Sequence, residues 1–170
     1  MTITIYTAMK IVFDSSSLIL LVEKLNLRET LTKCASSGMT LILPEKVLFE
    51  FKEKNDYPGT LTYINETFRI EKIENCSELS VFLDEDSGEI SVASIGKELK
   101  ERKEEYLCII DEKYSSKIFK LTGLETKGTI GLLLLLKDRG ILTSQDLKEI
   151  KDKIEKSDFR ITKEYLDKLG

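Results

Sequence analysis

Carboxylates that follow predicted buried strands are the residues of this sequence best placed to do chemistry. Asp14 comes directly after the apolar run 11–13, and Asp111 and Glu112 come after the apolar run 106–110. The carboxyl ends of parallel strands meet at one edge of an open α/β sheet, and ligands bind at that edge. A single aspartate in such a place serves equally well to cap the next helix. Acids at two separate strand ends favour a shared site.

Two glutamates on predicted helices extend this acidic set. Glu89 lies near the start of the predicted helix 86–100, on the face that carries its apolar residues. A carboxylate is unfavourable there unless it is paired or binds a ligand. Glu50 flanks the apolar stripe of the predicted helix 44–54. Each also has a plain structural interpretation, Glu89 as a first-turn acid favoured by the helix dipole and Glu50 as a surface residue.

Four carboxylates at one sheet edge repel one another, and this repulsion raises their pKa values unless a cation lies between them. Mg²⁺ and Mn²⁺ prefer oxygen ligands, activate water and stabilise charge at a phosphodiester. The chain contains no histidine. That absence removes Ser-His-Asp and Cys-His mechanisms and the usual catalytic zinc sites. The acids therefore predict metal-assisted hydrolysis at a phosphate.

The composition is that of an ordinary globular domain. Hydrophobic residues make up 41% and charged residues 33% of 170 residues, and this length suits one domain. The net charge of −4 argues against a protein that coats nucleic acid, but it leaves room for a nuclease with local basic contacts. The amino terminus lacks the pattern of a signal peptide, and no apolar run is long enough to span a bilayer. We therefore expect a cytoplasmic protein.

The cysteines predict neither a disulfide framework nor a zinc site. Cys34, Cys76 and Cys108 are odd in number and widely spaced, and none belongs to a C-x-x-C pair. We expect buried free thiols, with Cys108, in a predicted strand, as the clearest case.

Short apolar strands separated by helices must position the acids. We expect strands at 10–14, 39–44 and 106–110, and an edge strand at 68–73. We expect helices at 15–24, 28–37, 44–54, 86–100, 128–140, 144–156 and 162–169, with further helical turns after Pro58-Gly59 and from Glu112 to about Leu121. This alternation predicts a parallel sheet covered on both faces, an α/β protein with three layers.

Residue choice at the predicted helix starts supports these boundaries. Pro44 suits the first turn of the helix that carries Glu50, because a first-turn residue needs no backbone N–H. Thr143 and Asp146 have the spacing of a capping box at the start of 144–156.

The order of the motifs resembles a known family. The segments, in chain order, are IVFDSSSLILL, PEKVLFE, DSGEISVASIGKEL, CIIDEKYSSKIFKLTG and GTIGLLLLLKDRGIL. Together they resemble the PIN-domain family, and most closely its prokaryotic branch of VapC-like toxin nucleases. The ending SDFRITKEYLDKLG is similar to the tail of a longer, largely uncharacterised subgroup. The resemblance implies one Rossmann-like α/β/α sandwich over 1–170, with a core at about 10–142 and a C-terminal helical extension at about 143–170.

The resemblance also implies a Mg²⁺- or Mn²⁺-dependent ribonuclease. Its catalytic acids correspond to Asp14, Glu50, Glu89 and the pair Asp111 and Glu112. Asp14, Glu89 and Asp111 are the implied metal ligands, with Glu112 left open as an alternative to Asp111. The polar residue near the first acid of the family corresponds to Ser16, which would hold a water or orient Asp14.

The sequence departs from the family pattern at one acidic and one basic position of the site. Glu112 stands where the family more often has aspartate, and Lys117 stands where it often has arginine. A lysine offers a point charge in place of a bidentate fork. Lys113, Lys117 and Lys120 recur on one face of the helix after Asp111, where they either contact RNA phosphates or form a solvated surface.

A second hypothesis is a catalytically weak or inactive PIN-like module that binds nucleic acid or protein. The partners that the resemblance implies are the RNA substrate, an antitoxin protein and a second copy of the chain. The sequence fits a response receiver or a haloacid-dehalogenase-like phosphatase poorly, because Asp14 is followed by Ser15-Ser16 and not by a second nearby acid. No G-x-x-x-x-G-K-[ST] loop is present.

Overall fold

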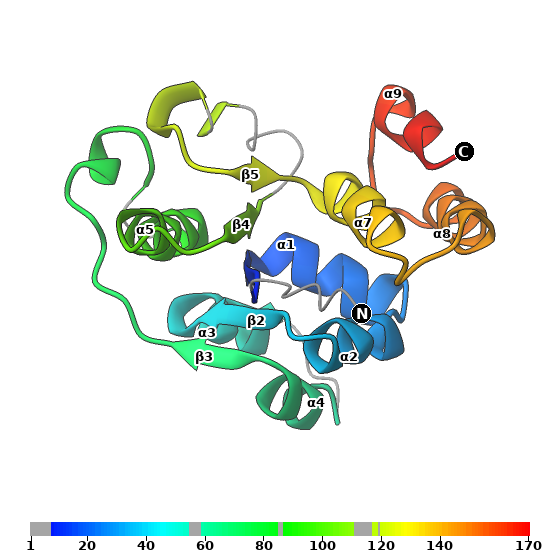
Figure 1. The fold of residues 1–170 in the computed structure, drawn as a ribbon, viewed down its shortest axis with the longest axis horizontal. Coiled ribbons are helices and arrows are strands. Elements are labelled where there is room, and N and C mark those ends of the chain that lie inside the picture. Colours follow the sequence, from blue (N-terminus) through cyan, green and yellow to red (C-terminus); the bar gives the residue numbers. More distant parts are fainter. Residues whose placement is uncertain (1–7, 55–58, 85–86, 111–116, 119) are drawn as a thin grey trace, which may run out of the picture.

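The computed structural model describes residues 8–54, 59–84, 87–110, 117–118 and 120–170 (Figure 1). The described residues form a five-stranded parallel sheet in the order β3-β2-β1-β4-β5. The strands are β1 Lys10–Phe13, β2 Thr40–Pro44, β3 Arg69–Glu71, β4 Tyr106–Ile109 and β5 Thr126–Lys127. The central strand β1 pairs with both neighbours, Val12 lying opposite Ile42 on β2 and Cys108 on β4.

Helices cover both faces of the sheet (Figure 1). The helical segments are α1 Ser15–Leu18, the π-helix η1 Ile19–Lys24, α2 Arg28–Ser36, α3 Glu45–Lys54, α4 Thr60–Thr67, the 3₁₀ turn η2 Leu79–Val81, α5 Gly88–Glu101, α7 Thr129–Asp138, α8 Ser144–Lys156, α9 Lys163–Leu166 and the 3₁₀ turn η3 Asp167–Leu169. Helices α3 and α5 pack on one face, whereas α1, α2 and α7 pack on the other. The predicted three-layer α/β/α sandwich is therefore confirmed.

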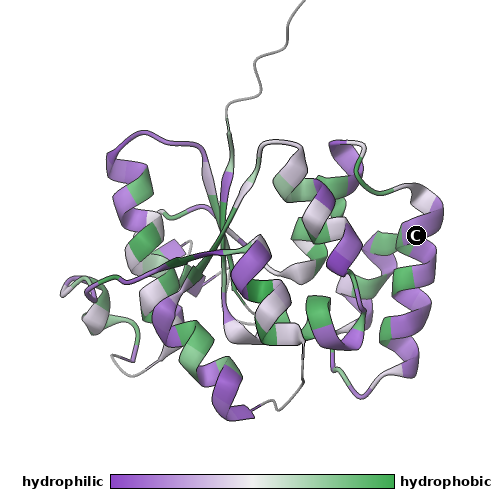
Figure 2. Cartoon of the chain, turned by 90° about the horizontal axis from the view of Figure 1, so that it is seen from below, coloured by the Kyte–Doolittle hydropathy of each residue, from purple (hydrophilic) through white to green (hydrophobic). Residues whose placement is uncertain are grey.

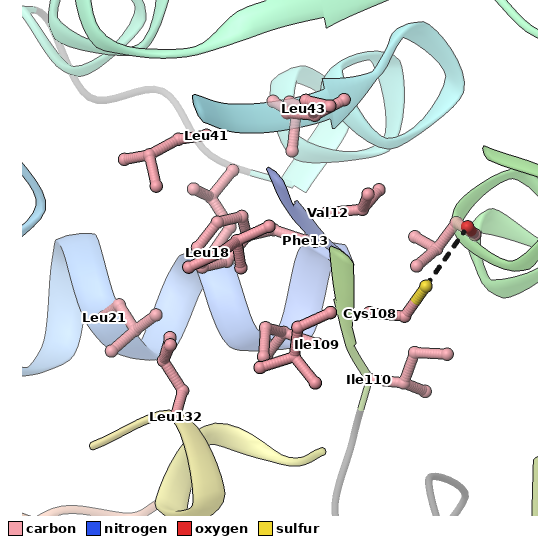
Figure 3. Packing of buried hydrophobic residues seen from close by; sticks show 14 of the residues in the cluster. Val12, Phe13, Leu18, Leu21, Leu41, Leu43, Cys108, Ile109, Ile110 and Leu132 are labelled. Carbon is pink, nitrogen blue, oxygen red and sulfur yellow. Dashed lines mark hydrogen bonds between the residues drawn. The ribbon is translucent and has the colours of Figure 1, made fainter. Parts of the chain in front are cut away.

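Alternation along the central strands divides the core between the two helical layers (Figure 3). Phe13 and Ile109 face α1 and contribute to one half, whereas Val12 and Cys108 face α5. All four are fully buried, as expected for a parallel sheet covered on both sides. Figure 2 shows the complementary surface pattern, with apolar residues on the inner faces of the helices and polar residues outward.

Helix α5 packs unusually close to the sheet. The Sγ of Cys108 lies 3.7 Å from the backbone oxygen of Val92, and an added Cβ on Gly96 would lie 2.5 Å from the same sulfur. Glycine at position 96 thus lets α5 approach β4. Position 96 lies about two helical turns from the start of α5, where Glu89 is found.

Several sequence predictions hold at the level of elements. The edge strand is β3, at one end of the sheet order. Thr143 and Asp146 form the predicted capping box: the Asp146 N–H donates to Thr143 Oγ1 at 3.1 Å, and the Thr143 N–H donates to Asp146 Oδ2 at 2.8 Å. The leucines of α7 are largely core, with Leu132, Leu133 and Leu136 buried. No helix in the described part of the chain has the length and apolarity needed to cross a membrane.

Four local predictions need correction. Strand β5 was not predicted, because two residues are too few to show alternation. Pro44 is the last residue of β2, opposite Glu71, and α3 begins at Glu45. The predicted helix 15–24 changes at Ile19 into a π-helix, in which the Leu25 N–H donates to the Leu20 carbonyl at 2.9 Å.

The fourth correction concerns the thiols. All three cysteines are free, but only Cys34 and Cys108 are buried, whereas Cys76 is partly exposed. Burial raises the pKa of Cys34 to about 11 and that of Cys108 to about 12.

Candidate active site

Asp14 lies at the carboxyl end of the central strand and is 2% exposed. Its backbone N–H donates to the Ile109 carbonyl at 3.0 Å, so the ladder with β4 continues one residue past β1. Its Oδ1 accepts the Ser17 N–H at 2.8 Å, which makes Asp14 the N-cap of α1. The capping role considered for Asp14 is therefore real, and it fixes the carboxylate at the sheet edge.

Glu50 faces the first turn of α1 from the neighbouring helix α3. The Ser15 hydroxyl donates to Glu50 Oε2 at 3.3 Å. Glu50 is half-buried, so it is not a fully solvated surface residue. Ser15 directly follows Asp14. Its hydroxyl therefore links the first turn of α1, which Asp14 caps, to the Glu50 carboxylate.

Gly88 brings the start of α5 against the same carboxylate. An added Cβ on Gly88 would lie 2.8 Å from Glu50 Oε2 and 3.1 Å from Val47 Cγ2. Glu89 is the residue that follows this close approach of α5 to Glu50. The elements that carry Asp14, Glu50 and Glu89 converge at the same sheet edge, as their positions in the sequence predict.

Glu89 itself is half-buried and lines a cavity of about 260 Å³. Lys117 lines the same cavity, so the structure brings together a predicted acid and a predicted phosphate-binding lysine. Ser16 is half-buried in the first turn of α1, and Lys120 is exposed.

Asp111, Glu112 and Lys113 lie outside the described residues. The chain can be followed to Ile110, whose N–H donates to the Lys127 carbonyl at 3.0 Å. Strand β4 thus ends beside β1 and β5 at the edge that carries Asp14. The choice between Asp111 and Glu112 as the ligand stays a prediction.

Sequence reasoning missed three residues of this region. The Ser15 hydroxyl donates to Glu50, and Gly88 leaves room for its carboxylate; the only signals of these two residues were their places next to Asp14 and Glu89. Ser17 is the third: its hydroxyl oxygen is buried next to the cap and has no hydrogen-bond partner within the described residues. A buried hydroxyl without a partner destabilises the folded state, so a residue of this kind is a candidate for a role in the site.

The donor chemistry of this edge fits a hard divalent cation. Asp14, Glu50 and Ser15 supply only oxygen atoms, which Mg²⁺ and Mn²⁺ prefer. Within the described residues no three acidic or cysteine side chains are already gathered in a metal-binding group. The further predicted ligand, Asp111 or Glu112, lies outside these residues.

Comparison with known proteins identifies the family. A family model described as a PIN domain matches residues 10–169. The chain belongs to the PIN-domain family. No curated protein matches the chain. PIN domains are generally nucleases, that is, hydrolases, and typically use divalent metal ions. The match extends from β1 to η3, so it includes Asp14, Glu50 and Glu89 as well as the C-terminal helices.

Proposed function

We propose that this PIN domain is a Mg²⁺- or Mn²⁺-dependent ribonuclease that hydrolyses RNA phosphodiester bonds. The observation that carries the proposal is the linkage of two acids from different elements: Asp14 caps α1, and Ser15 of the same turn donates to Glu50 on α3. A capping aspartate needs no such partner. Joining it to a second carboxylate at the carboxyl edge of a parallel sheet is the arrangement of a site.

Asp14, Glu89 and Asp111 would hold the metal ion, with Glu112 as the alternative to Asp111. When bound, the ion supplies an activated water and stabilises the charge that develops on the phosphate. The protein groups then have separate tasks. Asp14 is held by the Ser17 N–H, which fixes its orientation. Glu50, oriented by the Ser15 hydroxyl, accepts the proton of the attacking water.

Cations must neutralise the RNA backbone around this acidic edge. Lys113, Lys117 and Lys120 are the proposed phosphate contacts, and Lys117 lies in the cavity that also contains Glu89. The half-buried Ser16 is proposed to hold a water beside Asp14. Because the chain is acidic overall, with a net charge of −4, we expect its affinity for RNA to rest on these few lysines.

The direct test is cleavage of RNA by the purified chain with Mg²⁺ or Mn²⁺, and with excess chelator. Asp14→Asn is the informative variant, because asparagine still caps α1 while the charge is lost. Glu50→Gln likewise keeps an acceptor for Ser15. We expect each variant to lower the cleavage rate by about 10²- to 10⁴-fold. Glu53→Gln, exposed on the same helix, is the control and should cleave normally. Activity that persists in Asp14→Asn or in chelator contradicts the proposal.

The alternative is a PIN-like module with weak or no catalysis that binds nucleic acid or protein. It is favoured by Glu112 in place of aspartate, by Lys117 in place of arginine and by the acidic net charge. A calorimetric titration with Mg²⁺ and Mn²⁺ separates the two. A working site binds the ion and loses it in Asp14→Asn, whereas an inactive module with displaced acids binds it poorly in both forms.

We also propose a cellular role as the toxin of a toxin–antitoxin pair, acting in the cytoplasm, with an antitoxin protein and a second copy of the chain as partners. Induced expression should then arrest bacterial growth, and Asp14→Asn should relieve the arrest. Light scattering of the purified chain would test the homodimer. Growth that continues during expression of an active nuclease would contradict the toxin role while leaving the ribonuclease proposal intact.

A further inference from the structure

An apolar wall borders the cavity that contains Glu89. Ile118, Leu121 and Phe82 line it together with Glu89, Lys117 and a second acid, Asp84. Ile118 is buried, but Phe82 is 45% exposed and Leu121 is 44% exposed. Large apolar side chains that stay accessible in a cavity next to charged groups are typical of binding sites.

A second cavity of about 440 Å³ shares both of these exposed side chains. Phe82 and Leu121 thus form a ridge between two adjacent hollows, and we call them the Phe82–Leu121 ridge. Glu89 and Lys117 lie on one side of the ridge. Lys100, whose Nζ donates to the Gly123 carbonyl at 3.1 Å, lines the hollow on the other side.

This combination suits an unpaired nucleotide. An exposed aromatic face stacks on any nucleobase, because every base has a π-face, and lysines beside it neutralise the phosphates that flank the base. The ridge supplies the aromatic side chain, and Lys117 supplies positive charge beside it. In the second hollow Lys100 is accompanied by the acids Glu78 and Glu101. An occupant of the smaller cavity also reaches Glu89, so it lies beside one of the proposed metal ligands.

We propose that the cavity beside Glu89 is a nucleobase subsite, in which a base next to the scissile phosphate leaves its stack and rests on Phe82, with its phosphate near Lys117. The inference rests on the proposed ribonuclease function and adds a residue that selects unpaired nucleotides. A nucleotide, which joins an aromatic base to an anionic phosphate, suits the exposed Phe82 and the adjacent Lys117 better than an apolar protein segment does.

Binding of short single-stranded RNAs in excess chelator tests the subsite without cleavage. The probe is 2-aminopurine, placed at each position of the RNA in turn, because its fluorescence falls when it stacks. We expect quenching at one position and a dissociation constant that Phe82→Ala raises by about 5- to 150-fold. Phe82→Trp should restore both signals. An abasic nucleotide at that position should weaken binding to the natural chain by a similar factor and leave binding to Phe82→Ala unchanged.

Phe49 provides the matched control. It is 56% exposed on α3, with Lys52 Nζ 5.8 Å from its ring centroid, and it is not among the described residues that line the cavity. Phe49→Ala should bind RNA like the natural chain. Two results would overturn the subsite: equal weakening of RNA binding in both phenylalanine variants, or no quenching of 2-aminopurine at any position. Normal quenching in a chain that fails to cleave RNA would instead overturn the ribonuclease proposal alone.

Discussion

Replacing Gly88 with alanine should separate the geometry of the site from the stability of the fold. Gly88 is the buried first residue of α5, and its φ lies outside the left-handed region, so alanine meets no backbone strain. The new Cβ would lie 2.8 Å from Glu50 Oε2 and 3.1 Å from Val47 Cγ2. The substitution therefore acts mainly on the carboxylate that Ser15 holds.

The size of the effect follows from these two distances. Ordinary contacts begin at 3.4 Å, so Oε2 must move by at least 0.6 Å, and the Val47 methyl by a few tenths of an ångström. Glu50 Oε2 is the far end of a flexible side chain, so the strain stays near the lower end of the 1–3 kcal/mol of an overpacked site. Alanine regains about 0.5–1 kcal/mol of helix propensity. The free energy of unfolding should change by about 1 kcal/mol or less. A displaced catalytic group lowers the rate by up to about 10²-fold per ångström.

The assay is RNA cleavage and urea unfolding of the same preparations, with Gly96→Ala as the control on the same helix. A Cβ on Gly96 would lie 2.5 Å from the buried Cys108 sulfur, far from Glu50 along α5. Gly96→Ala should lose about 1–3 kcal/mol of stability and keep its cleavage rate per folded molecule. Full activity in Gly88→Ala, or a loss of activity that merely follows the loss of folded protein, would refute the reasoning.

Four further predictions concern buried or capping groups. Ser17→Ala removes a buried hydroxyl without a described partner, so the free energy of unfolding should rise by about 1 kcal/mol, and a fall would show that the hydroxyl is satisfied. Thr143→Ala removes the N-cap of α8 and should lower the free energy of unfolding by about 1 kcal/mol, measured in urea, whereas an unchanged midpoint would contradict the capping role. Iodoacetamide should label Cys76 first, by mass spectrometry, because burial raises the pKa of Cys34 to about 11 and of Cys108 to about 12. For the same reason the unfolded thiols ionise first above their ordinary value of 9.0, so stability should fall between pH 9 and 11, and less so in Cys34→Ala/Cys108→Ala.

The layers of the fold could be predicted from the sequence because its apolar and helical patterns are consistent along the chain. Apolar runs of three to five residues predicted β1, β2 and β4, and the capping residues predicted the start of α8. Strand β5 could not be predicted because two residues show no periodicity, and the strand is defined by its pairing with β4. The π-helix after α1 could not be predicted because helical periodicity does not distinguish hydrogen bonds to residue i−4 from those to residue i−5.

The elements that carry the candidate acids could be predicted from the sequence, but the groups that hold those acids could not. Asp14 follows a strand and Glu89 starts a helix, so topology alone brings them to one edge. Sequence reasoning singled out Ser16, yet the hydroxyl that contacts Glu50 belongs to Ser15, because the capping turn rotates the first residue of α1 toward α3. Contacts of this kind depend on the angle between two helices, which no local pattern specifies.

The most direct test of the central claim, that Asp14 and Glu50 act as one site on RNA, is a double-mutant cycle. Cleavage rates are measured with Mg²⁺ for the natural chain, Asp14→Asn, Glu50→Gln and the double variant. Groups that act as a unit are strongly non-additive, so the double variant should be little slower than the slower single variant. Rate losses that multiply in the double variant, or single variants that cleave at the natural rate, would contradict the claim.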